Sequence, residues 1–339
     1  MMSDPIQPLP GYQKNRQIEE LLADTNARLE PVEQEIRKQY TEPELPSIFL
    51  IGLPRSGHTL AGQILTTRYK LAYPSNFIAR LWKTPILGTR LQKTALDQSF
   101  GGKFPKQDYT SEHGLTFGPY GLHEFGYFWS RFFDFEENHY VNKQKLSTLD
   151  TDWLKSVVAG MQKESGGLPV LFKNGTIGFQ AGFISQIFPK SIFIFCIRDP
   201  LYVCQSIFNV RVKRFGAKEA WFGFKPPEYN RLKELRWDEQ IAGQVVSTYK
   251  ALKKQLQNIP EDRKLIVKYE ELCQDTGFFC REVNRLTELH GWRLNKKEEI
   301  PSAFTFKNEK NIDEKEFQMI KDALNKFSSD ENVNDFIYT

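Results

Sequence analysis

The residues that bear most directly on chemistry lie in one short loop. Gly52-Leu-Pro-Arg-Ser-Gly-His-Thr59 follows the apolar run 48–51 and opens a predicted helix over 59–65. Its spacing, G-x-x-x-x-G-x-[ST], is typical of loops whose backbone N–H groups surround a multiply charged oxyanion. His58 stands where nucleoside triphosphatases have a lysine, and the permanent cation of the loop is Arg55. The loop therefore indicates an anion site and disfavours hydrolysis of ATP or GTP.

A second cluster follows another apolar run. Residues 192–197 end in Arg198-Asp199-Pro200, and Ser206 follows on a predicted helix. An arginine at the carboxyl end of a parallel strand lies in the crevice where such sheets bind ligands, and the serine can face the same crevice. The pair suits a phosphate monoester. An apolar run ending in aspartate also resembles a magnesium site, but the flanking residues favour a structural ion pair for Asp199.

Alternating strands and helices must position these residues. The predicted strands are residues 48–51, 168–172, 192–197 and 264–267, and the later predicted helices are residues 182–188, 201–213, 237–257 and 273–289. This alternation indicates an α/β fold with three layers, α/β/α, and a central parallel sheet covered on both sides. Residues 71–146 are rich in Gly, Pro and aromatic side chains and show little periodicity.

The chain before the first strand differs in character. Residues 13–40 predict one or two polar helices with sparse apolar positions, interrupted at Pro31. Residues 41–46 read as a linker. We therefore expect an N-terminal helical arm and linker over residues 1–44 and one main domain over residues 45–339.

Composition narrows the class of protein. The 339 residues carry 46 basic and 42 acidic side chains, a net charge of +4, which is too mild for a polybasic nucleic-acid arm. The longest apolar run, residues 191–197, is far short of a membrane helix, and the N-terminus lacks the pattern of a secretory signal. The 4 cysteines show no C-x-x-C spacing and are expected to be reduced and buried. We expect a cytoplasmic protein without a membrane span or a nucleic-acid partner.

Three motifs carry a resemblance to a known family. Residues 53–59 resemble the 5′-phosphosulfate loop of sulfotransferases that use 3′-phosphoadenosine 5′-phosphosulfate (PAPS), usually Pro-Lys/Arg-Ser-Gly-Thr-Thr. Residues 195–206 resemble their 3′-phosphate motif, and Lys268-Tyr-Glu-Glu-Leu272 is similar to a later Tyr-Glu-Asp-Leu element. The motifs stand in the family's order over about residues 45–275. The resemblance implies a bacterial-type enzyme with a fold like that of P-loop NTPases, which binds PAPS without a metal and releases 3′,5′-ADP.

The resemblance also implies site residues. The 5′-phosphosulfate would be surrounded by Arg55, Ser56, Gly57, His58 and Thr59, and the 3′-phosphate would be held by Arg198 and Ser206. Leu60 belongs to the same site, at the position where cytosolic members often carry a tryptophan that stacks on the adenine. Trp237 is a candidate for that stacking. Phe306-Lys307-Asn308 is a weak counterpart of the family's Arg-Lys-Gly loop, and His58 replaces its usual threonine.

Sulfuryl transfer to an alcohol needs charge stabilisation on the bridging oxygen and a base for the attacking hydroxyl. Arg55 suits the first role, and Lys173 is a candidate to assist it. Cytosolic sulfotransferases take the base from a Lys-x-His segment, but residues 173–175 here are Lys-Asn-Gly. Other branches use a glutamate shortly before an aromatic pair, an arrangement that residues 122–129 resemble. Glu124 is therefore the first candidate base and His123 the second, and aromatic surroundings predict a raised pKa for Glu124.

Glu112 and His113 lie in a similar loop and stay alternatives for the base. His139 and His290 are interpreted as surface or core histidines. The leading prediction is a PAPS-dependent sulfotransferase acting on a hydroxyl of a small molecule, with residues 115–135 and 215–229 as candidates for an apolar acceptor site. The alternatives are a P-loop kinase with a degenerate phosphate loop, and a nucleotide-binding pseudoenzyme.

Overall fold

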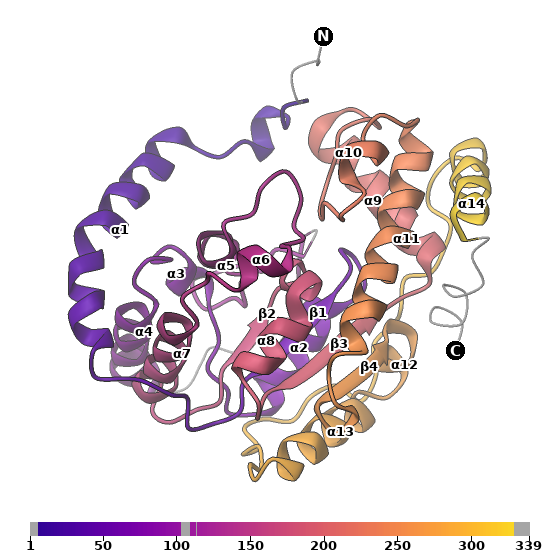
Figure 1. The fold of residues 1–339 in the computed structure, drawn as a ribbon. Helices are drawn as coiled ribbons and strands as arrows, with labels where there is room; N and C mark the ends of the chain where they lie inside the picture. The colour runs from indigo at the N-terminus through magenta and orange to yellow at the C-terminus, as the bar shows by residue number, and fades with distance from the viewer. Residues whose placement is uncertain (1–5, 103–108, 113, 329–339) are drawn as a thin grey trace.

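A computed structural model describes residues 6–102, 109–112 and 114–328, and a parallel sheet lies at its centre (Figure 1). Within the described residues the strands are β1 (Ile48–Gly52), β2 (Leu171–Lys173), β3 (Ile192–Ile197) and β4 (Lys264–Lys268). They pair in the order β2-β1-β3-β4, and every pairing is parallel. The predicted α/β class with a central parallel sheet is confirmed. β2 begins later than predicted, because residues 168–170 lead into the sheet without joining the strand.

Helices cover both faces of this sheet. The alternate side chains of β1 separate the faces: Phe49 and Ile51 point to one core, Ile48 and Leu50 to the other. The second core is covered by α2 (His58–Arg68), α12 (Tyr269–Gln274) and α13 (Thr276–Leu289). The larger first core is covered by α5 (Gly126–Phe133), α7 (Thr151–Glu164), α8 (Ala181–Ile187), α9 (Pro200–Phe215), α11 (Trp237–Leu256) and α14 (Glu314–Ser328). Shorter helices lie in the connections between these elements: α3 (Asn76–Ala79), α6 (Lys143–Leu146) and α10 (Tyr229–Leu232).

The larger core is held together by aromatic side chains. The Phe49 ring stacks between Phe172 and Phe193, with centroids 5.5 and 5.1 Å away. Trp129 of α5 meets Phe49 and Phe172 edge-on. Such rings bury large apolar areas and fix their neighbours' orientation. These rings thus join neighbouring strands and anchor α5 to the sheet that positions the loops.

The register brings the predicted anion turns together. Gly52 at the end of β1 lies opposite Cys196 in β3, so Arg198 leaves β3 beside the loop that follows Gly52. β2 flanks β1 on the other side and ends at Lys173. Because all strands are parallel, their carboxyl ends share one edge of the sheet, where ligands bind in such folds.

The N-terminal segment forms one long helix, α1 (Arg16–Arg37), which contains Pro31 without ending there. It lies along the outside of the molecule beside α3 and α4 (Pro85–Phe100) (Figure 1). The helix is bonded to the body at its middle: the Asn26 side chain donates to the carbonyl of Arg80 and accepts from the N–H of Lys83, both at 2.8 Å. Glu33 is 4% exposed and accepts hydrogen bonds from N–H groups in the first turn of α4.

Glu33 is expected to make stability depend on pH. Burial raises the pKa of Glu33 to about 7, so the folded state retains a proton that the unfolded state has lost. Its contribution is therefore complete below about pH 4.5 and is lost as the pH rises through 7, a change of about 3 kcal/mol in the free energy of unfolding. Glu33→Gln should remove this part of the pH dependence when thermal unfolding is followed from pH 5 to 8. Glu35→Gln, at an exposed position of the same helix, is the control and should not; equal slopes in wild type and Glu33→Gln would contradict the assignment.

One sequence interpretation is wrong in detail, and one segment contains a helix that the sequence did not indicate. Residues 71–146 include a helix of 16 residues, α4, despite their weak periodicity. The helix predicted over 273–289 is divided at Asp275, whose side chain accepts from the N–H of Phe278 at 2.8 Å and caps α13.

All 4 cysteines fall within the described residues and are free and buried, as expected. No helix in the described ranges is both long and apolar enough to cross a membrane.

Candidate active site

The loop between β1 and α2 presents backbone N–H groups at a helix N-terminus. Arg55 and Gly57 have φ values of 70° and 90°, which turn the chain into α2. In the described part of the chain no side chain caps this helix, so the N–H groups of its first turn keep their hydrogen-bonding capacity and the positive end of the helix dipole. A Cβ at Gly57 would overlap the ring of Tyr269, so glycine is required there for space as well as conformation. The loop has the geometry of an anion site.

Arg198 joins this loop to the other two motifs. Its Nη1 donates to the carbonyl of Arg55 at 3.0 Å and its Nε to Oδ1 of Asn308 at 2.9 Å, while Nη2 donates to the carbonyl of Lys307. The guanidinium lies 4.8 Å from the centroid of the Tyr269 ring, which belongs to the third motif. The three motifs and residues 307–308 therefore meet at one place.

Positive charge accumulates here. Arg55 donates from Nε to the hydroxyl of Ser206 at 2.8 Å. Burial lowers the pKa of Arg55, and the nearby charges of Arg198 and Arg214 lower it further. Nε of Arg214 is buried and finds no hydrogen-bond partner among the described residues. Crowded guanidinium groups repel one another, so an anion with several charges would stabilise the cluster.

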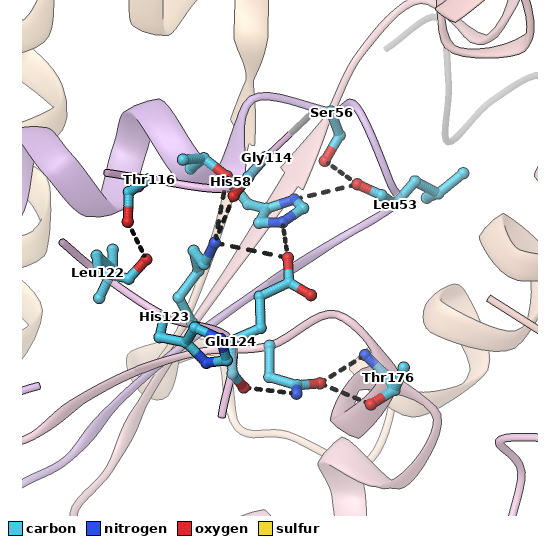
Figure 2. A network of polar contacts seen from close by, with 12 residues as sticks. Leu53, Ser56, His58, Gly114, Thr116, Leu122, His123, Glu124 and Thr176 are labelled. Carbon is cyan, nitrogen blue, oxygen red and sulfur yellow. Dashed lines mark hydrogen bonds and ion pairs between the residues drawn. The ribbon is translucent and has the colours of Figure 1, made fainter. Parts of the chain in front are cut away.

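A network of polar contacts lies beside the loop, with Glu124 at its centre (Figure 2). Oε1 of Glu124 lies 3.2 Å from Nε2 of His58 and 3.5 Å from Nζ of Lys173. Nδ1 of His58 faces the carbonyl of Leu53 at 3.1 Å, so both ring nitrogens face oxygen atoms. Lys173 is 1% exposed and also contacts Oγ1 of Thr59 at 3.4 Å. The network ties the loop to the carboxylate.

The expected raised pKa of Glu124 is wrong. Burial alone would raise the pKa of Glu124, but attraction to Lys173 and the hydrogen bond with His58 outweigh it and lower the value to about 2. The sequence places aromatic rings next to Glu124 but does not reveal that two basic side chains converge on the carboxylate. Glu124 is ionised at neutral pH and accepts hydrogen bonds.

A cavity of about 670 Å³ opens over the loop and the strand ends. The predicted residues that line it are Arg55, Gly57, His58, Thr59, Leu60, Glu124 and Arg198. Ser56, Lys173 and Ser206 are not among the residues that line it: Ser56 donates to the carbonyl of Leu53 at 2.8 Å, and the other two contact Thr59 and Arg55. In the described ranges no group of three or more His, Cys, Asp or Glu side chains is arranged to hold a metal ion.

Other candidates lie elsewhere. His123 lines a different cavity, and its Nδ1 accepts from the N–H of Phe125 at 2.8 Å. Trp237 does not line the cavity over the loop; it packs in the core against Phe208, which overturns its proposed stacking on adenine. Glu112 pairs with Lys213 at 2.8 Å and is also absent from the cavity wall. His113 lies outside the described residues.

Asp199 is the N-cap of α9, and among the described residues it forms no ion pair with Arg198, which the sequence had favoured. Its side chain accepts from the N–H of Leu201 at 2.8 Å. His290 lies away from the cavity and faces the carbonyl of Asp262 at 3.2 Å. His139, by contrast, does line the cavity, although the sequence indicated only a surface or core position. Burial lowers the pKa of His139 to about 4, and its Nδ1 accepts from the N–H of Lys225.

Sequence reasoning missed several residues of the cavity wall. Arg214 lies at the end of α9, where a basic residue commonly faces solvent, so nothing in the sequence marked it. Tyr109 and Phe304 meet edge-on with centroids 5.1 Å apart, and both line the cavity beside Leu60. These two rings are far apart in sequence, so only the fold reveals the pair.

Comparison with known proteins assigns the chain to a family. A model of the family described as "Sulfotransferase family" matches residues 46–293. The chain belongs to the sulfotransferase family. The match includes the phosphate loop, the Arg198 segment and Tyr269, the three elements that meet in the structure. This confirms the family indicated by the motifs.

Relatives of this sulfotransferase are distant. Over 245 residues it is 23% identical to the omega-hydroxy-beta-dihydromenaquinone-9 sulfotransferase Stf3 of Mycobacterium bovis and of Mycobacterium tuberculosis. The alignment covers 68% of this chain and 59% of Stf3, so the chain spans less than two thirds of that relative. Among solved structures, STF9 of Mycobacterium avium has a TM-score of 0.47 at 12% identity, covering 97% of this chain and 80% of that one. STF1 of Mycobacterium tuberculosis H37Rv has a TM-score of 0.45 at 12% identity, covering 91% and 76%.

Proposed function

We propose that this sulfotransferase moves the sulfuryl group of PAPS onto a hydroxyl of an apolar small molecule. The observation that carries the proposal is the meeting of the two anion-binding turns, with Nη1 of Arg198 3.0 Å from the carbonyl of Arg55. One adenosine bisphosphate can span them. The N-terminus of α2 would receive the 5′-phosphosulfate, and Arg198 with Ser206 would hold the 3′-phosphate.

Positive side chains supply the electrostatic part of the reaction. Arg55 bonds to Ser206 and stands in the phosphate loop, so its guanidinium connects the two ends of the proposed donor site. As the sulfur–oxygen bond to the phosphate breaks, charge grows on the bridging oxygen, and a cation placed in advance stabilises it. Arg214 and Lys307 add positive charge to the same cavity. The orphaned Nε of Arg214 and the uncapped amides of α2 fit an oxyanion-rich donor.

The adenine ring has an aromatic site in the same cavity. Leu60, Tyr109 and Phe304 all line it and pack against the second core. They offer a flat ring an apolar contact surface, which replaces the tryptophan that many family members have at the position of Leu60.

Glu124 is the proposed base. Its side chain is 40% exposed, lines the cavity, and is ionised at neutral pH because of Lys173 and His58. The acceptor oxygen would attack sulfur in line with the departing phosphate, and its proton would pass to the Glu124 carboxylate as the new bond forms. Lys173 and His58 would hold the carboxylate in place without touching the acceptor.

An apolar acceptor suits the rest of the cavity wall. Leu115, Phe222 and Phe224 also line it. The relative Stf3 is named as the sulfotransferase of a hydroxylated menaquinone derivative, which is an apolar alcohol. Both observations support an alcohol with an apolar skeleton as the acceptor of this enzyme.

Isothermal titration tests the nucleotide assignment. We expect 3′,5′-ADP to bind in the micromolar range and ATP with Mg²⁺ not to bind. The reverse pattern would favour a kinase and overturn the proposal. Turnover is then tested with ³⁵S-labelled PAPS and a panel of apolar alcohols, in which label should appear on the alcohol. Nucleotide binding without transfer to any alcohol or amine would favour a pseudoenzyme.

Glu124→Gln is expected to lower the rate of transfer by about 10² to 10⁴, the usual contribution of a general base. Affinity for 3′,5′-ADP should change by less than about threefold, because Glu124 lies outside the proposed nucleotide contacts. Glu112→Gln is the matched control, since Glu112 was the alternative base in the sequence but pairs with Lys213 and does not line the cavity. Loss of transfer in Glu112→Gln with full activity in Glu124→Gln would reverse the assignment of the base.

Removing the charge of Glu124 leaves Lys173 buried without its counter-ion, which by itself destabilises the fold. Glu124→Asp keeps that charge and withdraws the carboxylate by one methylene. It should retain the unfolding temperature of the wild type and still lose most of the transfer rate.

A further inference from the structure

A second cavity, of about 1010 Å³, lies between helix α1 and the body of the molecule. Its apolar wall comes from both sides: Ile18 and Leu22 on α1, and Phe77, Trp82, Phe117 and Tyr127 on the body. Asn26 and Glu33 bond α1 to the body, and the part of the helix before Asn26 forms the roof of the cavity.

This cavity adjoins the proposed active site. Leu115 lines both cavities, and the consecutive residues His123 and Glu124 line one each. The two cavities are therefore neighbours, and Leu115 stands in the wall between them.

The wall of the second cavity includes several apolar side chains that are exposed. Ile18 is 48% exposed, Leu115 51% and Phe117 61%. Large apolar side chains gathered in one hollow at such exposure mark a binding surface, because water contact there is unfavourable. The charged side chains Lys14 and Glu19 pair with each other and with the Tyr127 hydroxyl, so their charges are balanced within the wall.

We propose that this cavity binds the hydrocarbon chain of the acceptor, which is therefore a long-chain alcohol whose hydroxyl lies at Glu124. This rests on the proposed sulfuryl transfer and adds the class of acceptor. The apolar side chains of the wall give the chain its binding energy. A compact phenol would fill the first cavity and leave the second without a role.

A series of linear primary alcohols from butanol to hexadecanol tests the proposal. In the transfer assay kcat/KM should rise with chain length, by roughly fourfold per methylene over the part of the chain that enters the cavity. Ile18→Glu should lower the ratio of kcat/KM for hexadecanol to that for butanol at least tenfold. Leu21→Glu is the matched control: Leu21 is 64% exposed on the same helix and does not line the cavity, and its ratio should stay that of the wild type.

A constant kcat/KM along the series, or equal effects of Ile18→Glu and Leu21→Glu, would overturn the proposal. Sedimentation identifies the other possible occupant of the surface. If Ile18→Glu converts a dimer into a monomer and leaves the chain-length dependence unchanged, the surface is an interface between two copies and the proposal is wrong.

A binding measurement keeps the test independent of turnover. A long-chain alcohol with a terminal bromine should quench the fluorescence of Trp82, which lines the cavity, and the Trp82→Phe variant should lose that quenching. Absence of quenching would overturn the proposal even if short alcohols are sulfated and 3′,5′-ADP binds. Quenching without any binding of 3′,5′-ADP would support the chain site and instead contradict the proposed sulfuryl transfer.

Discussion

Arg55→Ala should abolish sulfuryl transfer, by about 10³-fold or more, while 3′,5′-ADP still binds within a few-fold of the wild type. Arg55 is the cation of the phosphate loop, and the growing charge that it stabilises exists only during transfer. The product nucleotide lacks the sulfuryl group, so its affinity reports the remaining contacts. Transfer of ³⁵S and titration with 3′,5′-ADP, measured on the same preparation, give the two quantities.

Arg55→Lys serves as the control for this substitution. It keeps the positive charge but loses the planar fork of donors, so it should recover part of the transfer rate. If Arg55→Ala weakens 3′,5′-ADP as strongly as it slows transfer, Arg55 binds the nucleotide itself and its proposed role in the reaction is wrong.

Arg198→Ala should weaken 3′,5′-ADP by about 30-fold or more, equal to about 2 kcal/mol, the scale of a lost charge-assisted contact. The structure adds a second reason. Arg198 also bonds to the carbonyls of Arg55 and Lys307 and to Asn308, so its removal loosens the surroundings of the proposed phosphate site. Titration of the variant with 3′,5′-ADP measures the loss.

Asn308→Ala separates these two effects. It removes one bond to Arg198 but leaves the cation, so 3′,5′-ADP should weaken only a few-fold. Wild-type affinity in Arg198→Ala would show that the second motif does not bind the 3′-phosphate.

The sequence predicts the sheet and the two turns well because each has a local signal. β3 has the predicted bounds, since an uninterrupted apolar run between Ser191 and Arg198 leaves one interpretation. α4 lacked such a signal because Thr89, Gln92 and Gly88 share its buried face with Ile86 and Leu96. Polar and small residues on the inner face hide the apolar periodicity on which helix prediction depends.

Only the site residues that lie within sequence motifs could be predicted. Arg55 and His58 lie in one short motif and Arg198 in another, and the structure brings all three to one cavity. Arg214 was not predictable, because α9 also ends with Lys213 and nothing in the sequence says which basic side chain turns inward. The lowered pKa of Glu124 likewise depends on Lys173 and His58, which approach it from other strands and loops.

The bonds from Arg198 to residues 307 and 308 have a consequence for synthesis of the chain. Translation supplies the phosphate loop early and the partners of Arg198 more than a hundred residues after it. A nascent chain still attached to the ribosome can therefore form the sheet and present the phosphate loop before the guanidinium of Arg198 is bonded to residues 307 and 308. Nucleotide binding should reach its full affinity only once residue 308 has left the exit tunnel.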